Sequence, residues 1–99
     1  FIKADGKLIR LHDNDINFIE AVGDYVKFVT TEKTFLSLAT LKSIEEKLNS
    51  DAFVKVHRSY IINTKKISDI EDNTILIGKH VIPISKAHRK VIMDRLNII

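Results

Sequence analysis

The sequence predicts a mostly β fold with two short helices. Three observations point to it: short apolar or alternating runs recur along most of the chain, tight-turn pairs such as Asp5-Gly6 separate them, and helical spacing of apolar residues is confined to two places. With 44% hydrophobic and 29% charged residues, the 99-residue chain has the composition of a folded protein. We expect a single domain spanning residues 1–99.

The first half of the chain is expected to form strands joined by tight turns. Asp5-Gly6 fits a type I′ hairpin turn, in which both central residues have positive φ. Residues 16–22 are apolar at nearly every position except Glu20, as in a strand that is central or covered on both faces. Gly23-Asp24 then turns the chain into a strand at residues 25–30, which a further hairpin joins to residues 34–38.

Two short helices are expected. Thr40 is suited to cap the first, and Ser43-x-x-Glu46 offers an alternative capping box one turn later. The inner stripe of this helix is Leu41, Ile44 and Leu48. The second runs from about Lys86 to Leu96. Its expected cap is Ser85, and its expected inner stripe is Val91, Ile92 and Leu96.

A hairpin precedes the second helix. Its strands, at residues 74–77 and 80–84, are joined across Gly78-Lys79. Because Pro83 cannot donate to a strand ladder, we expect the last strand to be an edge or to leave the sheet.

The charge is distributed unevenly. Residues 1–50 contain seven Lys or Arg and eight Asp or Glu, a balance of −1, whereas residues 51–99 contain nine and five, a balance of +4. The second half therefore favours an anionic partner. The absence of cysteine excludes disulfides and thiolate metal sites, and no apolar run approaches the ~20 residues of a membrane span.

Residue patterns for enzymatic chemistry are weak. His57 lies near Ser59, but neither an orienting third group nor a glycine-rich elbow accompanies them. The four histidines show no metal-ligand spacing, and nucleotide-binding glycine motifs are absent. We expect no catalytic residue, no metal, no cofactor and no small-molecule substrate.

The segment Phe53–Asn63 has an alternation that begins and then breaks. Val54 and Val56 share one face of a strand, and an undisturbed strand would bury Arg58 on that same face. The chain is therefore expected to bulge or turn near Arg58 and Ser59, which would direct the guanidinium outward. His57 is expected to be a hydrogen-bonded structural residue.

Three cations stand at the start of the second helix. Lys86, Arg89 and Lys90 occupy a place where the helix dipole favours anions, so they are unfavourable there in an isolated helix. A bound phosphate would resolve this conflict. The alternative is that the three cations are simply solvated.

Four segments together resemble the LytTR-type DNA-binding domain, the output module of many bacterial response regulators. They are residues 19–27 (Ile-Glu-Ala-Val-Gly-Asp-Tyr-Val-Lys), residues 37–45 (Ser-Leu-Ala-Thr-Leu-Lys-Ser-Ile-Glu), residues 53–63 (Phe-Val-Lys-Val-His-Arg-Ser-Tyr-Ile-Ile-Asn) and residues 82–86 (Ile-Pro-Ile-Ser-Lys). The resemblance covers essentially the whole chain, in the family's order and spacing. It implies an elongated, mostly antiparallel β fold.

The resemblance also implies sequence-specific binding of double-stranded DNA by loops and strand ends, without a recognition helix. Carried onto this chain, its contact positions are Tyr25, Val26, Lys27, Arg58, Ser59, Ser85, Lys86, Ala87, His88 and Arg89, to which the charge argument adds Lys90. Val26 and Ala87 cannot hydrogen-bond a base edge, so they could offer only apolar contact with a thymine methyl. Arg58 is the expected base reader, and the remaining cations and hydroxyls are expected to hold phosphates.

The family further implies a cytoplasmic two-component regulator. A receiver domain is expected before Phe1, in a phosphorelay, and the full-length protein is expected to bind promoter direct repeats as a dimer. A different interpretation is a β-rich protein-interaction module, whose edge strand at residues 80–84 pairs with an acidic partner. A third is single-stranded RNA binding, for which only Tyr25 and Tyr60 could stack on bases.

Overall fold

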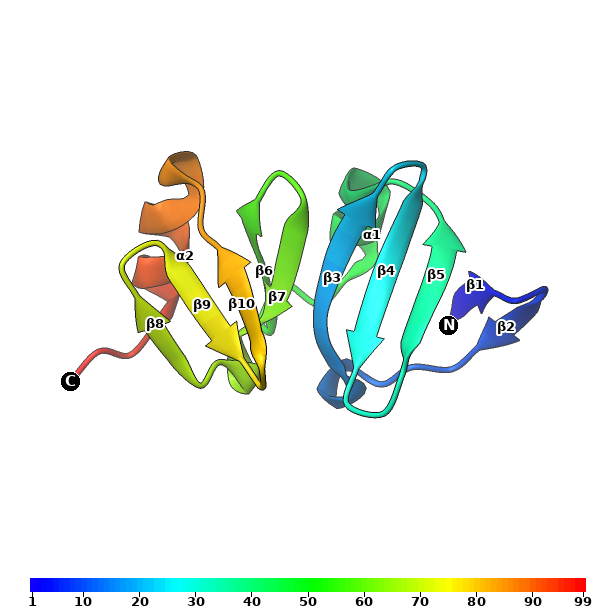
Figure 1. The fold of residues 1–99 in the computed structure, drawn as a ribbon, viewed down its shortest axis with the longest axis horizontal. Helices are drawn as coiled ribbons and strands as arrows, with labels where there is room; N and C mark the ends of the chain where they lie inside the picture. The colour runs from blue at the N-terminus through cyan, green and yellow to red at the C-terminus, as the bar shows by residue number, and fades with distance from the viewer.

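The computed structural model describes all of residues 1–99 and contains ten short strands in three antiparallel sheets (Figure 1). The molecule is elongated, with extents of 44 × 24 × 23 Å. At one end, β1 (Ile2–Ala4) pairs with β2 (Lys7–Ile9). The turn between them has positive φ at both Asp5 (54°) and Gly6 (73°), which confirms the predicted hairpin.

The central sheet has five strands in the order β5-β4-β3-β7-β6. These strands are β3 (Ile16–Val22), β4 (Tyr25–Thr30), β5 (Thr34–Leu38), β6 (Phe53–His57) and β7 (Tyr60–Asn63). β3 lies in the middle, as its near-continuous apolar sequence predicted. Its register shifts between Ile16 and Phe18, which sends Ile16 and Ile19 to one face of the sheet and Phe18 to the other.

A three-stranded sheet lies at the other end of the molecule (Figure 1). Its strands are β8 (Asp69–Glu71), β9 (Thr74–Ile77) and β10 (His80–Pro83), in the order β10-β9-β8. Pro83 therefore stands in an edge strand, as predicted, where its missing N–H costs no ladder hydrogen bond.

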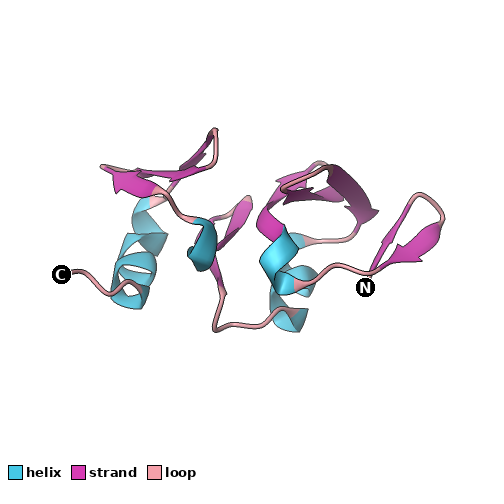
Figure 2. Cartoon of the chain, turned by 90° about the horizontal axis from the view of Figure 1, so that it is seen from below, coloured by secondary structure: helices cyan, strands magenta, loops and turns pink.

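The helices are short and lie below the strands in Figure 2. The first is α1 (Leu41–Lys47), and the Thr40 hydroxyl caps it by accepting from the Ser43 amide at 3.1 Å. Two three-residue 3-10 turns are also present: η1 (Asp13–Asp15) precedes β3, and η2 (Thr64–Lys66) follows β7. No helix combines the length and the apolar character needed to cross a membrane.

The second helix differs from the prediction. Residues 86–88 form a 3-10 turn, η3 (Lys86–His88), and the α-helix α2 (Arg89–Arg95) begins only at Arg89. The Ser85 side chain makes no capping hydrogen bond, because its hydroxyl is bonded to the His88 ring. Val91 is 49% exposed, so the predicted inner stripe was wrong at this position, and Ile92 is the fully buried residue.

Two hydrophobic cores cover the two faces of the central sheet. On one face, α1 and the N-terminal hairpin pack over Ile19, Val26 and Phe28. On the other, the three-stranded sheet and Ile92 of α2 pack over Phe18 and Val56. The second core covers only part of its face, because over β4 and β5 that face is open to solvent, with Leu36 51% and Leu38 73% exposed.

Asn63 is the one fully buried polar side chain among the largest buried residues. Its Nδ2 donates to the carbonyl oxygens of Asp13 and Ile16, both at 3.0 Å, and its Oδ1 accepts from the Lys65 amide at 3.0 Å. Two of these bonds reach η1 and the start of β3, and the third reaches the residues that follow β7. Asn63 therefore fixes where β7 meets the start of β3.

Replacing Asn63 with Ala removes these three hydrogen bonds, of which the one to the Ile16 carbonyl is buried. We expect the Asn63→Ala variant to lose roughly 1–3 kcal/mol of unfolding free energy, measured by urea denaturation. Asn97, exposed beyond α2, provides the matched control, and Asn97→Ala is expected to unfold with the wild-type midpoint. Equal midpoints for the two variants would contradict the role of Asn63.

Candidate nucleic-acid interface

Three segments distant in sequence reach one long edge of the molecule. They are the β3–β4 turn at Gly23-Asp24, the β6–β7 turn at Arg58-Ser59, and the chain from Ser85 through η3. All three lie at the upper edge in Figure 1. Two backbone hydrogen bonds connect them: the Ala21 amide donates to the Ser59 carbonyl at 2.8 Å, and the Ser85 amide donates to the Val56 carbonyl at 2.9 Å.

The β6–β7 turn has the predicted break in its alternation. The register between β6 and β7 shifts between Lys55 and His57, and the chain then turns at Arg58-Ser59. Arg58 is exposed, and its side chain makes neither a hydrogen bond nor an ion pair. Together with Gly23, Asp24 and Tyr25 it lines a shallow hollow on the surface.

His57 supports this turn from inside. Its Nδ1 accepts a hydrogen bond from the Ser59 amide at 3.1 Å, and its ring meets the Tyr60 ring edge-on with 5.6 Å between centroids. The expectation of a hydrogen-bonded structural histidine is confirmed. The bond holds Ser59, and with it the exposed Arg58, in one conformation.

The contact positions on β4 divide into three environments. Tyr25 is 48% exposed at the start of the strand. Val26 is fully buried in the core under α1, so its expected contact with a thymine methyl has to be corrected: no base can reach this side chain in the folded chain. Lys27 is partly exposed and pairs with Glu20 at 3.2 Å.

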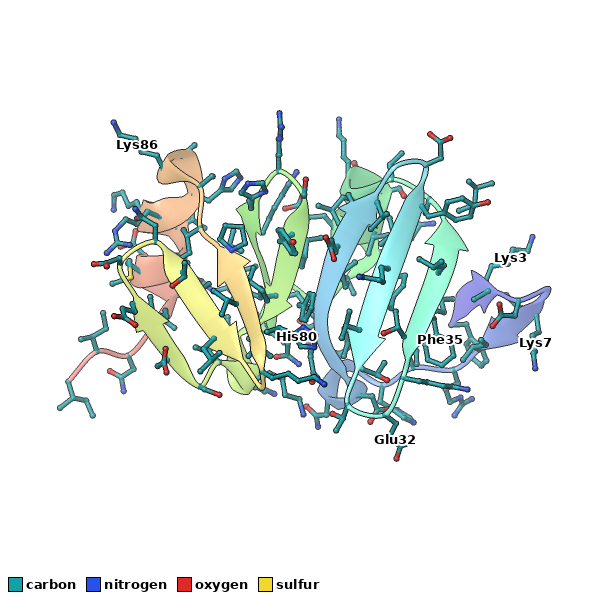
Figure 3. The ribbon with its side chains drawn as sticks, viewed as in Figure 1. Lys3, Lys7, Glu32, Phe35, His80 and Lys86 are labelled. Carbon is teal, nitrogen blue, oxygen red and sulfur yellow. The ribbon has the colours of Figure 1, made fainter.

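The contact positions after Ser85 also differ in their exposure and in their partners. Lys86 and Ala87 are exposed, and Lys86 projects from the upper edge in Figure 3 without a carboxylate partner. His88 is partly buried and bonded to the Ser85 hydroxyl. Lys90 forms an ion pair with Asp94 at 2.8 Å, and its hydrogen bond to Asp94 raises the Lys90 pKa.

Arg89 is held by other groups of the protein and is therefore not free to bind an anion. Its guanidinium donates to the Asp72 carbonyl and approaches Asn73 Oδ1 at 3.4 Å, so it fastens α2 to the turn between β8 and β9. Of the three cations expected to draw a phosphate, only Lys86 is thus without a protein partner. Because α2 is short and begins three residues late, the dipole argument does not carry over to Lys86.

Glu20 is the residue whose importance the sequence argument missed. One carboxylate oxygen lies 3.2 Å from Lys27 Nζ, and the other accepts from the Tyr60 hydroxyl at 3.0 Å. It therefore links β4 and β7 across β3. The signal was available, because Glu20 is the single charged residue in a mostly apolar strand.

Burial and the contact with Glu20 both act on the Tyr60 hydroxyl. Burial raises the pKa of Tyr60 above its ordinary value of 10.0, and the hydrogen bond to Glu20 together with its negative charge raises the Tyr60 pKa further. The arrangement can position a turn and present Arg58 and Lys86 to an anion. It contains no nucleophile bonded to a general base that a third group orients.

The chain is thus an elongated β fold that presents exposed cations along one edge, an arrangement suited to an anionic partner. The chain belongs to the LytTR family: the family model, described as the LytTr DNA-binding domain, matches residues 6–97. The family is a DNA-binding one and not a catalytic one.

Known relatives agree with this assignment. The chain is 27% identical over 103 residues to the sensory transduction protein LytT of Enterococcus faecalis, covering 98% of this chain and 43% of the relative. It is 31% identical over 70 residues to the transcriptional regulatory protein LytR of Staphylococcus aureus, covering 71% of this chain and 28% of the relative. It thus spans less than half the length of these curated relatives.

The fold has a counterpart among solved structures. A LytTr DNA-binding domain from Bacillus cereus superposes with a TM-score of 0.82 at 22% identity, covering 98% of this chain and 94% of that one. The likeness confirms the predicted elongated, mostly antiparallel β fold with two helices.

The raised pKa of Tyr60 predicts a specific pH dependence of stability. The folded chain holds the phenolic proton more tightly than the unfolded chain, so this stabilisation is present below pH 10.0 and is lost as the pH rises through the raised pKa. In urea unfolding between about pH 9 and 11, we expect the wild type to lose stability more steeply than Tyr60→Phe.

The matched control is Tyr25→Phe, because Tyr25 is exposed and makes no hydrogen bond to a carboxylate. It is expected to follow the wild-type pH profile. Parallel profiles for the wild type and Tyr60→Phe would show that the Glu20 contact has no thermodynamic effect.

Proposed function

We propose that this chain binds double-stranded DNA sequence-specifically through the edge formed by its three joined segments. The observation that carries the proposal is the pair of backbone hydrogen bonds from Ala21 and Ser85, which fix the segments relative to each other while leaving Arg58 and Lys86 unpaired. Cations carried by fixed backbone segments can match the spacing of phosphates and base edges. Membership of a DNA-binding family supports the same partner.

Within this proposal the candidate residues have different roles. Arg58 inserts toward a base edge, where a guanidinium can donate two hydrogen bonds to guanine. Lys86 contacts a phosphate, and the exposed Ala87 lies beside it. Lys27 and Lys90 bind phosphate only by exchanging their carboxylate partners, and Arg89 positions the segment instead of touching DNA. Tyr25, Ser59, Ser85 and His88 flank the contacts, and Val26 is excluded by its burial.

The size of the edge limits the site that one copy can cover. The long axis of 44 Å corresponds to roughly 13 base pairs at about 3.4 Å each. In the full-length protein, we propose that this domain is the output of a two-component regulator that acts in the cytoplasm, with a receiver domain and dimeric binding to promoter direct repeats. The named functions of LytT and LytR support that context.

Selection of bound duplexes from a random pool tests the function directly. At ~0.15 M salt, so that electrostatic binding does not mask specificity, we expect a defined motif to be enriched. Failure to enrich any motif, with binding to an acidic protein surface that duplex DNA does not displace, would favour the protein-interaction alternative.

The Arg58→Ala variant tests the base reader. It should lose roughly 1–3 kcal/mol of discrimination at one base pair of the selected motif, measured as the ratio of specific to random duplex binding. Lys42→Ala, on the exposed face of α1, is the control and should keep the wild-type ratio. A wild-type ratio for Arg58→Ala would remove Arg58 from the reading role.

Substitutions at Lys86 and Arg89 should change different quantities, the salt dependence of DNA binding for Lys86 and the stability for Arg89. Lys86→Ala is expected to reduce the slope of log affinity against log salt by about 1 without changing stability, because it removes one phosphate contact. Arg89→Ala is expected to lower the urea midpoint, since it frees the Asp72–Asn73 turn from α2. Equal salt slopes for Lys86→Ala and the wild type would exclude the phosphate contact.

A further inference from the structure

The strands at the two ends of the long axis carry opposite charge, with Lys7 in β2 and Asp69 and Glu71 in β8. At one end, the first ten residues hold Lys3, Lys7 and Arg10 against the single acid Asp5. At the other end, residues 69–73 hold three acids and no base. Figure 3 shows Lys3 and Lys7 at the end of the molecule opposite to β8, and away from the edge that carries Lys86.

Both ends also finish in an unpaired strand. β2 is hydrogen-bonded only to β1, and β8 only to β9, so each leaves one row of backbone groups without a strand partner. In β2, Lys7 is exposed and Leu8 is 68% exposed. In β8, Asp69 and Glu71 are exposed on either side of Ile70, which is half-buried against the second core.

The charges of these two edges are complementary. A ladder that sets Leu8 beside Ile70 also sets Lys7 beside Asp69 if the strands are parallel, or beside Glu71 if they are antiparallel. Antiparallel pairing of β8 with β8 would instead set Asp69 beside Glu71, whereas β2 paired with β2 about Leu8 sets Lys7 beside Ile9 and forms no ion pair. The charges thus oppose contact between two β8 edges and favour a head-to-tail contact.

We propose that neighbouring copies of this chain associate head to tail, with β2 of one copy adding to the β8 edge of the next. The occupant of each edge is a second copy, and the contact is weak because both strands are only three residues long. It becomes effective when another attachment holds two copies close together, since a weak contact gains from a high local concentration. This inference is independent of the proposed function and is testable without DNA.

Carbodiimide cross-linking, which joins an amine to a carboxylate without a spacer, tests the contact. Lys7 and β8 lie at opposite ends of a 44 Å axis, so a cross-link between Lys7 and Asp69 or Glu71 can form only between two copies. In concentrated protein at low salt we expect this cross-link in the peptide digest, reduced about fivefold in 0.5 M NaCl. Lys90 and Asp94, 2.8 Å apart within one chain, provide the internal standard.

Charge-reversal variants separate a specific contact from random collisions. Lys7→Glu and the double variant Asp69→Lys with Glu71→Lys should each abolish dimeric cross-linked product. Their mixture should restore it, because residue 7 of each variant then meets opposite charge on β8 of the other. Lys42→Glu makes the same charge change on α1 and should leave the yield unchanged. Circular dichroism and urea midpoints check that each variant folds.

Two results would overturn the inference. The first is cross-links spread evenly over exposed Lys and acid pairs. The second is a dimeric yield that Lys7→Glu leaves unchanged; if this variant also bound a short duplex with reduced affinity, the hairpin would be a DNA contact instead.

Discussion

The antiparallel pairing of β3 with β7 is the constraint on which the rest of the structure depends. It places Glu20 opposite Tyr60 and ends in the hydrogen bond from the Ala21 amide to the Ser59 carbonyl. The turn that carries Arg58 is thereby held beside the turn at Gly23-Asp24, although about 35 residues separate them, a span that local sequence signals do not bridge. A one-residue slip would move every side chain of β7 to the opposite face.

Several independent groups fix that register. Ile61 and Ile62 enter opposite cores, so a slip would expose one and misplace the other. Asn63 bonds three backbone groups near the start of β3, and the Tyr60 hydroxyl reaches Glu20. Packing, buried hydrogen bonding and charge therefore agree on one alignment, which is the condition for a rigid edge.

Local features of the fold were predictable from the sequence. Asp5-Gly6 requires only its own backbone conformation, and the failure of alternation at Arg58 follows from the cost of burying a guanidinium. The Thr40 cap is likewise a local matter. The family resemblance supplied the overall shape, which turn signals alone do not determine.

Features that depend on distant partners were not predictable. Period-two geometry separates Val26 from Lys27, yet only the cover provided by α1 and the N-terminal hairpin decides that Val26 is buried. Arg89 meets Asp72 and Asn73 across a gap that sequence spacing does not reveal. The late start of α2 follows from the Ser85 hydroxyl bonding to His88 rather than to a helix amide.

The exposed cations of the chain are not equally available to an anion. Exposed cations occur all over the chain, but those with a carboxylate neighbour already have part of their field neutralised. Arg58 and Lys86 differ because they stand free on segments that backbone hydrogen bonds fix. Their distinction is therefore positional, and the total charge of +3 contributes little to it.

The central claim is that one rigid edge makes the contact with DNA. The most direct measurement is an NMR titration of the ¹⁵N-labelled chain with the selected duplex, following every backbone amide. The account predicts that the large shift changes fall in residues 23–27, 57–60 and 84–88, with residues 41–47 of α1 unchanged. Changes centred on α1, or restricted to only one of the three segments, would contradict it.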